Sequence, residues 1–310
     1  MATIGFIPHP CRPEAVNLAM TTAAWLTAAG HRAPILTGPG GEASEGSESA
    51  VDLPMCDGGL VVEGAEGPQA AVRQRQREIA SQLDLAISLG GDGTMLRVVD
   101  LVAPFGVPVL GVNVGHLGFL TEVAPDELPQ ALKRFLAGEY RVEERMTLAV
   151  EVRTSLSERP PRITTALNDV VLQRSSLGHT VQLGVCINGS PFLTYAADSL
   201  IVATPTGSTA YNLSARGPIA SPRTRVLVMT PVAAHMLFDR SLVLAEEENV
   251  TFEILGDLPA ELVVDGQMLG SLSTGDVVRC RAGDHNARLV DFGGRDFHRV
   301  LKQKFGSADR

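Results

Sequence analysis

The stretch Leu89-Gly90-Gly91-Asp92-Gly93-Thr94 decides the fold predicted for the first half of this 310-residue chain. The apolar run from Leu83 to Leu89 is typical of a buried parallel strand, and the apolar spacing from Met95 to Val102 predicts a helix. The stretch is therefore expected to be a strand-to-helix turn. Its glycines let the backbone approach a ligand closely, and the start of the helix offers unpaired N–H groups. We predict a phosphate-binding turn formed by Gly90, Gly91, Gly93 and Thr94.

Asp92 lies at the centre of this turn, where its negative charge opposes a phosphate ligand. The carboxylate becomes useful if it takes a proton from a substrate or helps to hold a cation. Asp92 is therefore the first candidate for a chemical role. The alternative is an ordinary Asp-Gly turn without chemistry.

The composition limits the class of protein. Its length predicts two domains, and 45% hydrophobic residues suffice for sizeable cores. The 26 basic and 35 acidic residues give a net charge of -9, which argues against nucleic acid or an anionic membrane as the main partner. No apolar stretch approaches the roughly 18 to 20 residues of a membrane span, and no signal-peptide pattern opens the chain, so we expect a cytoplasmic protein.

The cysteines are few and scattered. They lack the paired spacing of a metal site and are too few for a disulfide framework, so we expect free thiols at Cys11, Cys56, Cys186 and Cys280.

Strands and helices alternate in the first half of the chain. Strands are expected at 3–7, 33–36, 83–89 and 107–112, and helices at 13–29, 73–81, 95–102 and 126–136. The Gly-, Ser- and Glu-rich segment from Gly38 to Ser49 is expected to be a solvated loop. This alternation predicts an α/β domain with an open, mainly parallel sheet. A second glycine-rich turn, Asn113 to Leu120, follows the strand at 107–112. Since ligands bind at the carboxyl ends of such strands, both turns are expected at one ligand site.

Period-2 segments dominate from Tyr140 onward and predict a mainly β second domain. Strands are expected at 147–152, 170–173, 180–187, 199–203, 225–229, 250–255 and 277–281. Turn signals stand at Asn188-Gly189, Asp265-Gly266 and Thr274-Gly275.

A hydroxyl-rich run, Thr204 to Ser214, interrupts this β-rich half. Pro205 and Gly207 keep it off regular strand structure, and its side chains and N–H groups suit a polar ligand. It lies close in sequence to Asp198, which favours a site over an ordinary surface loop.

These motifs together resemble those of the NAD kinases in content and order, over nearly the whole chain. The resemblance rests on Gly90 to Thr94, Asn113 to Leu120, Asn168-Asp169, Asp198, Thr204 to Ser214 and Asp265-Gly266-Gln267. The first motif is shared with lipid kinases and, more distantly, phosphofructokinases, whereas the second and the hydroxyl-rich run are far more specific.

The resemblance implies transfer of the γ-phosphoryl group of ATP to the 2'-hydroxyl of the adenosine ribose of NAD, giving NADP. It implies an α/β nucleotide-binding domain at 1–124, rejoined by 296–310, a β-sandwich NAD-binding domain at 125–295, and a homodimer or homotetramer. Asp92 matches the proton acceptor, because a ribose hydroxyl is a poor nucleophile until a carboxylate takes its proton. Mg²⁺ is expected to arrive with ATP, since no protein cage for it is visible.

The same matching assigns residues to NAD. They are Asp92, Gly93, Arg97, Asn168, Asp169, His179, Asp198, Thr209, Ala210, Tyr211, Ser214 and Gln267.

Three residues depart from the family pattern. Asp169 stands where glutamate is usual, so its carboxylate is one methylene shorter. Ser199 and Arg216 replace common glycines, and Ser199 would add strain if that position has a positive φ.

Two alternatives remain open at this point. One is a lipid or polyol kinase that shares the glycine-aspartate motif, and the other is a paralogue that binds the dinucleotide without turnover. Inorganic polyphosphate is an alternative to ATP as the phosphoryl donor.

Overall fold

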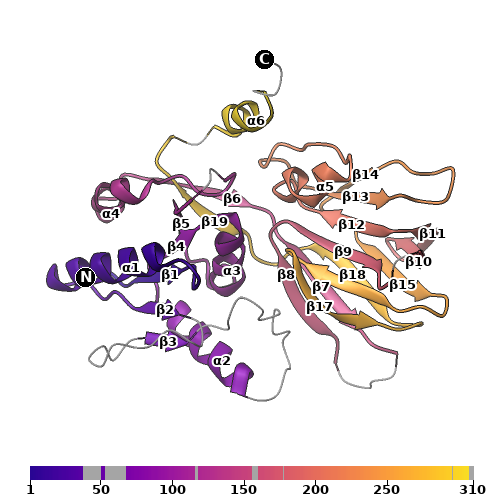
Figure 1. Cartoon of the computed structure of the whole chain (residues 1–310), viewed down its shortest axis with the longest axis horizontal. Helices are drawn as coiled ribbons and strands as arrows, with labels where there is room; N and C mark the ends of the chain where they lie inside the picture. The colour runs from indigo at the N-terminus through magenta and orange to yellow at the C-terminus, as the bar shows by residue number, and fades with distance from the viewer. Residues whose placement is uncertain are drawn as a thin grey trace. The chain divides into compact units, whose positions relative to one another are not determined.

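The computed structural model describes residues 1–37, 50–52, 68–115, 118–155, 160–176, 178–294 and 296–306. The segment predicted as a loop, Gly38 to Ser49, lies outside them, as does Cys56. The described chain divides into two compact units (Figure 1). The first runs to Glu144 and resumes at Ala287, and the second is Arg145–Asn286.

The first unit is built on one open sheet. In the described residues it has seven strands in the order β3-β2-β1-β4-β5-β19-β6. Their bounds are β1 Ile4–Pro8, β2 Ile35–Thr37, β3 Ala50–Asp52, β4 Leu85–Gly90, β5 Val109–Asn113, β6 Arg141–Arg145 and β19 Ala287–Asp291. The pairs of β1 with β2 and β4, of β2 with β3, and of β5 with β4 and β19 are all parallel. The predicted α/β class with a mainly parallel sheet is confirmed.

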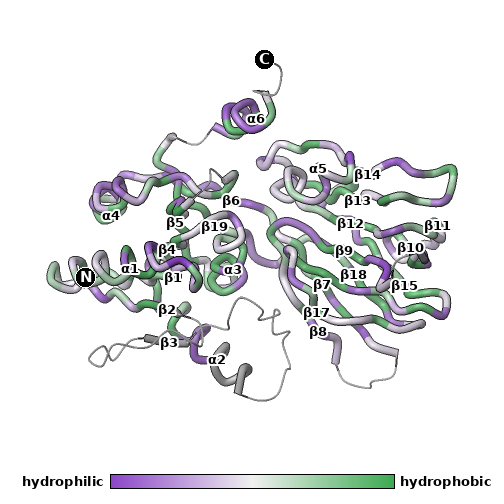
Figure 2. The backbone as a smooth tube through the Cα atoms, in the orientation of Figure 1, coloured by the Kyte–Doolittle hydropathy of each residue, from purple (hydrophilic) through white to green (hydrophobic). Residues whose placement is uncertain are grey.

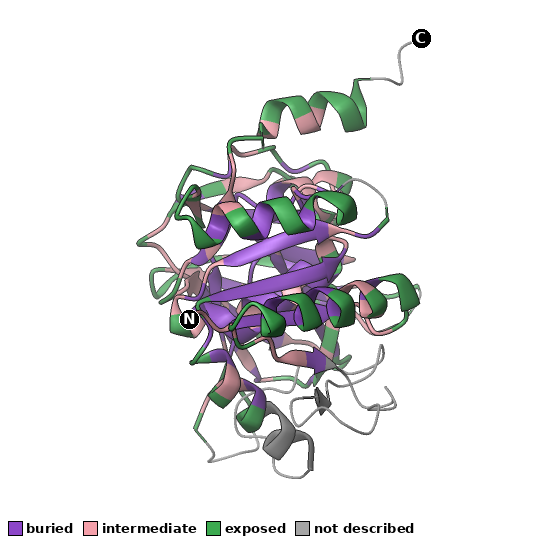
Figure 3. Cartoon of the chain, turned by 90° about the vertical axis from the view of Figure 1, so that its left-hand side faces the viewer, coloured by how far each residue is buried: buried purple, intermediate pink, exposed green. Residues whose placement is uncertain are grey.

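Helices connect these strands. They are α1 Pro13–Ala28, α2 Pro68–Ala80, α3 Asp92–Val102, α4 Leu128–Leu136 and α6 Phe297–Phe305, with 3-10 turns at Ala103–Phe105 and Pro125–Glu127. Proline at the first position starts α1, and Gly30 with φ of 84° follows its end. Its small residues Ala15 and Ala19 and its Leu26 are fully buried with the strands. Figure 3 shows the buried strands in purple and the exposed outer faces of helices in green.

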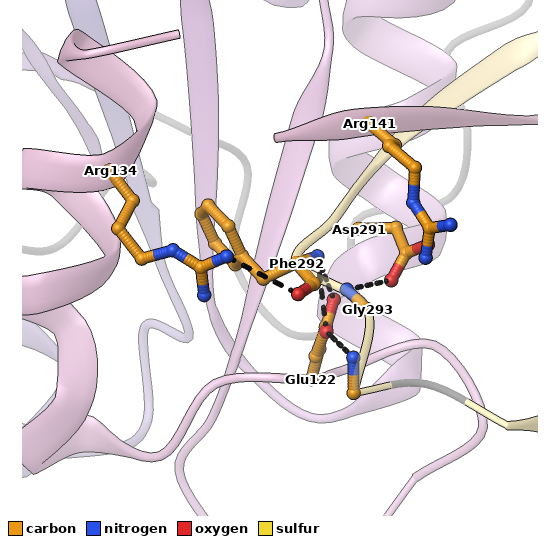
Figure 4. Close-up of polar contacts among 7 residues, drawn as sticks. Glu122, Arg134, Arg141, Asp291, Phe292 and Gly293 are labelled. Atoms are coloured by element: carbon orange, nitrogen blue, oxygen red, sulfur yellow. Dashed lines mark hydrogen bonds and ion pairs between the residues drawn. The ribbon is translucent and has the colours of Figure 1, made fainter. Parts of the chain in front are cut away.

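The chain returns to the first sheet through β19, which lies between β5 and β6. Side chains from earlier in the unit hold the segment that follows this strand (Figure 4). Glu122 accepts hydrogen bonds from the N–H groups of Phe292 (3.2 Å) and Gly294 (3.1 Å). Arg134 donates to the carbonyl of Phe292 and lies 4.6 Å above its ring centroid. Because β19 is a strand of this sheet, the chain rejoins the first unit at Ala287. The resemblance had implied that it rejoins at residue 296.

The second unit contains two antiparallel sheets. Each has six strands in the described residues, in the orders β11-β10-β15-β18-β7-β8 and β14-β13-β12-β9-β16-β17. The first comprises β7 Leu148–Arg153, β8 Arg162–Ala166, β10 Val181–Ile187, β11 Ser190–Ala197, β15 Val250–Leu255 and β18 Val277–Ala282. The second comprises β9 Asp169–Arg174, β12 Ser199–Ala203, β13 Val226–Val232, β14 Leu242–Ala245, β16 Ala260–Val264 and β17 Gln267–Leu272. A 3-10 turn at Gly207–Thr209 and the short helix α5 Tyr211–Ser214 follow β12.

The two sheets share one core. Leu183 and Phe252 of the first sheet are buried in the same cluster as Leu172 and Val202 of the second. Green segments recur along β9 and β12 in Figure 2, where green marks hydrophobic residues. The predicted β-sandwich is thereby confirmed.

Several strands were not predicted, and three of them, β11, β16 and β17, flank turns that were. Asn188 and Gly189, with φ of 53° and 77°, join β10 to β11, and Asp265 and Gly266, with φ of 48° and 76°, join β16 to β17. Two successive positive φ values are typical of a type I′ hairpin turn. Strands β3, β6, β8, β14 and β19 were also missed.

The cysteine expectation holds in part. Cys186 and Cys280 are free thiols, but Cys11 is disulfide-bonded, so the expectation is wrong for Cys11. No helix in the described ranges is long and apolar enough to cross a membrane.

Candidate functional site

The glycine-rich turn of the first unit joins β4 directly to α3. Gly91 is the N-cap and Asp92 the first helical residue, so the helix begins three residues earlier than predicted. The N–H groups of Asp92 and Gly93 therefore lack an acceptor within the helix. A Cβ added at Gly91 or Gly93 would meet no described atom within 4 Å. The turn thus presents open space and unpaired donors, which suit a phosphate.

Thr94 faces the opposite way. It is buried, and its N–H donates to the carbonyl of Gly91 at 3.0 Å. A Cβ at Gly90 would lie 2.3 Å from its hydroxyl oxygen, so these two residues pack against each other. Among the predicted phosphate ligands, Gly91 and Gly93 are the better placed.

The carboxylate of Asp92 connects the two glycine-rich turns. It accepts the N–H of Phe119 on Oδ2 at 2.8 Å and that of Leu120 on Oδ1 at 3.0 Å. A Cβ at Gly118 would lie 2.0 Å from Oδ1 of Asp92, so only glycine leaves room for this contact. Residues 116 and 117 of the second turn lie outside the described ranges.

Phe119 also contacts the C-terminal helix of the first unit. Its ring lies 6.3 Å from that of Phe297 and 6.4 Å from that of Phe305, centroid to centroid. The Nζ of Lys304 lies 4.4 Å above the ring centroid of Phe119. Helix α6 therefore packs on the residue whose backbone holds Asp92.

Cationic and imidazole groups lie near the glycine-rich turn. A Cβ at Gly90 would lie 3.3 Å from the Cβ of His9, and the guanidinium of Arg12 donates to the carbonyl of Val114. Burial lowers the pKa of His9, and the charges of Arg97 and Arg12 lower it further. Burial also lowers the pKa of Arg97. The guanidinium groups of Arg97 and Arg12 thus bring positive charge near the glycine-rich turn.

Asn168 and Asp169 of the second unit are held by a third residue. The carboxylate of Asp265 accepts the N–H groups of Leu167 (2.8 Å), Asn168 (2.7 Å) and Asp169 (3.1 Å). The N–H of Asp265 donates in turn to the carbonyl of Asp169 at 2.9 Å. Gln267 opens the strand that follows this turn.

Asp169 is 4% exposed. Burial raises the pKa of its carboxyl to about 7, with a further rise from the negative charge of Asp265 and an opposing effect of the Tyr211 N–H. The side chain of Asp169, one methylene shorter than the usual glutamate, is therefore buried, and it gains or loses its proton near neutral pH.

The hydroxyl-rich run has a buried half that builds the loop. Thr204 donates its hydroxyl to the carbonyl of Leu167 at 2.5 Å, and Ser208 donates to that of Pro205 at 2.6 Å. The four positions that the sequence assigned to NAD, Thr209, Ala210, Tyr211 and Ser214, are all exposed or half-buried, as is Leu213.

The two remaining NAD candidates of this unit differ in their contacts. Asp198 forms an ion pair with Arg174, with 3.0 Å between Oδ1 and Nε. His179 is exposed, just before β10.

The two positions where this chain lacks the usual glycine differ in backbone conformation. Ser199 begins strand β12 and has no positive φ, so the expected strain is absent there. Arg216 has φ of 63°, a left-handed conformation that favours glycine. Its N–H donates to Leu213 and that of Gly217 to Asn212, the pattern of a Schellman motif that ends α5.

Sequence reasoning missed Asp265 and Gly118 as site residues. Asp265 was noticed as a turn signal and as part of a family motif, but nothing in the sequence showed which N–H groups it accepts. No cluster of three or more His, Cys, Asp or Glu side chains that could hold a metal occurs in the described residues.

Two family models match the chain, one for each part. The ATP-NAD kinase N-terminal domain matches residues 4–140, and the ATP-NAD kinase C-terminal domain matches residues 167–292.

Similar proteins cover most of the chain. The NAD kinase of Heliobacterium modesticaldum is 37% identical over 305 residues, 98% of both chains. That of Moorella thermoacetica is 43% identical over 221 residues, 70% of both chains.

Two solved structures share the fold. Yeast NADH kinase complexed with NADH has a TM-score of 0.78 at 24% identity, covering 100% of this chain and 89% of that one. An NAD kinase from Archaeoglobus fulgidus in complex with ATP has a TM-score of 0.68 at 19% identity, covering 97% and 98%. The family matches and full-length relatives agree with the motifs described above, and the chain belongs to the ATP-NAD kinase family.

Proposed function

We propose that this NAD kinase uses Asp92 as the general base that takes the proton of the 2'-hydroxyl of the adenosine ribose. The observation that supports this role is the pair of backbone N–H groups, from Phe119 and Leu120, that fix the carboxylate. Each carboxylate oxygen accepts one of them and keeps a lone pair for the hydroxyl proton. As that proton leaves, the ribose oxygen attacks the γ-phosphorus of ATP, and the bond from that phosphorus to the bridging oxygen of ADP breaks.

The donor phosphates are assigned to the turn before α3. Its unpaired N–H groups at Asp92 and Gly93 and the positive end of the helix dipole favour negative charge. Arg97 and His9 are assigned to the same phosphates, because the His9 Cβ lies beside Gly90 and the charge of Arg97 acts on His9. Mg²⁺ usually binds through one or two carboxylates together with substrate phosphates, and the single fixed carboxylate of Asp92 fits that arrangement. When bound, Mg²⁺ would neutralise charge on the phosphates.

The contacts of NAD with the second unit are assigned to side chains that are polar or accessible there. Asp169 and Asn168 are assigned to a ribose because their side chains accept and donate hydrogen bonds, and Tyr211 because its side chain is exposed and has a ring face. The remaining assigned positions are His179, Asp198, Thr209, Ala210, Ser214 and Gln267. Cytoplasmic location, a homodimer or homotetramer, and polyphosphate as an alternative phosphoryl donor stay predictions.

The test measures NADP formation from NAD, ATP and Mg²⁺, detected with an NADP-specific dehydrogenase. Asp92→Asn keeps an acceptor oxygen but cannot take a proton, so kcat is expected to fall on the order of 10²-fold or more. Asp126→Asn, at an exposed position of the same unit, serves as the control and should retain wild-type activity. A wild type without NADP formation would contradict the kinase activity. An active Asp92→Asn enzyme would contradict only the role of Asp92.

A further inference from the structure

The turn between β16 and β17 reaches back to a segment almost one hundred positions earlier in the chain. Its Asp265 carboxylate accepts three consecutive N–H groups, two on Oδ1 from Asn168 and Asp169 and one on Oδ2 from Leu167. Three N–H groups that converge on one carboxylate fix the backbone direction of the segment that bears them. Asp265 itself has φ of 48°, so the turn is held in a conformation that suits few residues.

The same segment is fixed from its other side by the loop after β12. The N–H of Thr204 donates to the carbonyl of Asn168 at 2.8 Å, and its hydroxyl donates to that of Leu167. A Cβ at Gly207 would lie 2.0 Å from the carbonyl oxygen of Asn168, so the loop fits closely against this carbonyl. Asn168 is thus held between a carboxylate on its N–H side and a tight backbone contact on its C=O side.

We propose that Asp265 is a positioning residue for NAD: its carboxylate sets the placement of Asn168 and Asp169, and through them the affinity for the dinucleotide. This inference rests on the proposed NAD contacts of those two residues. Asp265 needs no contact with substrate for this role.

The electrostatic part of the role follows from which groups face Asp169. Among the described residues, the groups that act on its titration are the carboxylate of Asp265, from the β16–β17 turn, and the N–H of Tyr211, from α5. Buried Arg145, at the end of β6, points its guanidinium at the hydroxyl of Thr206, at 3.4 Å. Since the charge of Asp265 raises the pKa of Asp169, its removal must move that pKa to lower pH.

The experiment is the pH dependence of KM for NAD between about pH 5.5 and 8.5 in wild type and Asp265→Asn. An asparagine has one acceptor oxygen, and its NH₂ would face an N–H donor, so the segment loses part of its support. We expect KM for NAD to rise about 10-fold at pH 8, with kcat and KM for ATP little changed. We also expect the pH midpoint of KM for NAD to shift to lower pH.

Asp276→Asn is the matched control. Asp276 also accepts backbone N–H groups in this unit, those of Ser155 (2.7 Å) and Ser273 (2.8 Å). These contacts lie away from the segment that Asp265 holds. It should lower thermal stability without moving the midpoint. If Asp276→Asn raises KM for NAD as much as Asp265→Asn does, the effect is general loosening and the proposal fails. An unchanged KM and midpoint in Asp265→Asn overturns it as well.

Gly207→Ala separates placement from charge and serves if Asp265→Asn does not fold. It pushes on the carbonyl of Asn168 but leaves the charge of Asp265, so KM for NAD should rise while the midpoint stays. A normal KM in this variant overturns the role of segment placement. If wild type makes no NADP, the proposed function fails, and NAD binding by calorimetry in the same variants still decides the role of Asp265.

Discussion

Asp92 follows strand β4 and Asp169 begins strand β9, and the surroundings of the two carboxyl groups differ. Asp92 is half-buried and its carboxylate accepts two backbone N–H groups. Asp169 is buried, lies near a second carboxylate, and has its pKa raised to about 7. Burial beside a like charge opposes ionisation. The same type of side chain is therefore fixed by backbone donors in one unit, whereas in the other it is buried beside a second carboxylate.

The largest effect is expected on stability at Asp169. Its folded-state pKa of about 7 lies above the ordinary 3.8, so the unfolded chain ionises first as pH rises. Folding stability from this group is full below about pH 4 and is lost as pH rises to about 7. Asp169→Asn should therefore raise the free energy of unfolding at pH 8, by at most about 4 kcal/mol. Denaturant titrations at pH 8 and pH 4 measure it, and an equal gain at both pH values would contradict the buried charge.

Gly118→Ala tests the other aspartate. The added methyl group would displace the Asp92 carboxylate, and a misplacement of about 1 Å is expected to cost on the order of 10²-fold in kcat. The double variant Asp92→Asn/Gly118→Ala is the control, because a change that acts through Asp92 adds little once Asp92 is already neutral. Multiplicative losses in the double variant would show that Gly118 acts elsewhere.

The smallest effect concerns the helix that faces Asp169. Arg216 ends α5 with a positive φ, so Arg216→Gly should raise the free energy of unfolding by about 0.5 to 1 kcal/mol. Arg223→Gly, at an exposed position without positive φ, should instead lower it through the entropy of the unfolded chain. Thermal melts compare the two, and equal shifts would contradict strain at Arg216.

The sequence predicted the parts of the fold whose pattern is local. Apolar runs such as 83–89 and 250–255 identified strands because burial on one or both faces leaves a periodic signature. Strand β17, with Gly270 and an exposed Met268, has no such signature and gains its structure from pairing with β16. Strand β19 is short and depends on neighbours far earlier in the chain.

The site residues likewise divide into those that a local sequence pattern predicts and those that depend on contacts between distant segments. Asp92 and its glycines could be found because a turn between a strand and a helix is a local pattern. The support from Gly118 and Asp265 could not, because it depends on which segments the fold brings together. Likewise, the positive φ at Arg216 follows from its position just after the end of α5. This helix has only four residues, too few for the sequence pattern to reveal where it ends.

The position of β19 also constrains how the protein is made. Strand β5 gains its outer neighbour, and β6 its link to the sheet, only when residues 287–291 have been synthesised. The ribosome makes the second unit before it makes β19. At roughly 5 to 20 residues per second, this takes on the order of ten seconds. Throughout that interval the edge of β5 is open to pairing with other chains. The support that α6 gives to Phe119 comes from residues 297–305, so it too forms only after the second unit has been synthesised.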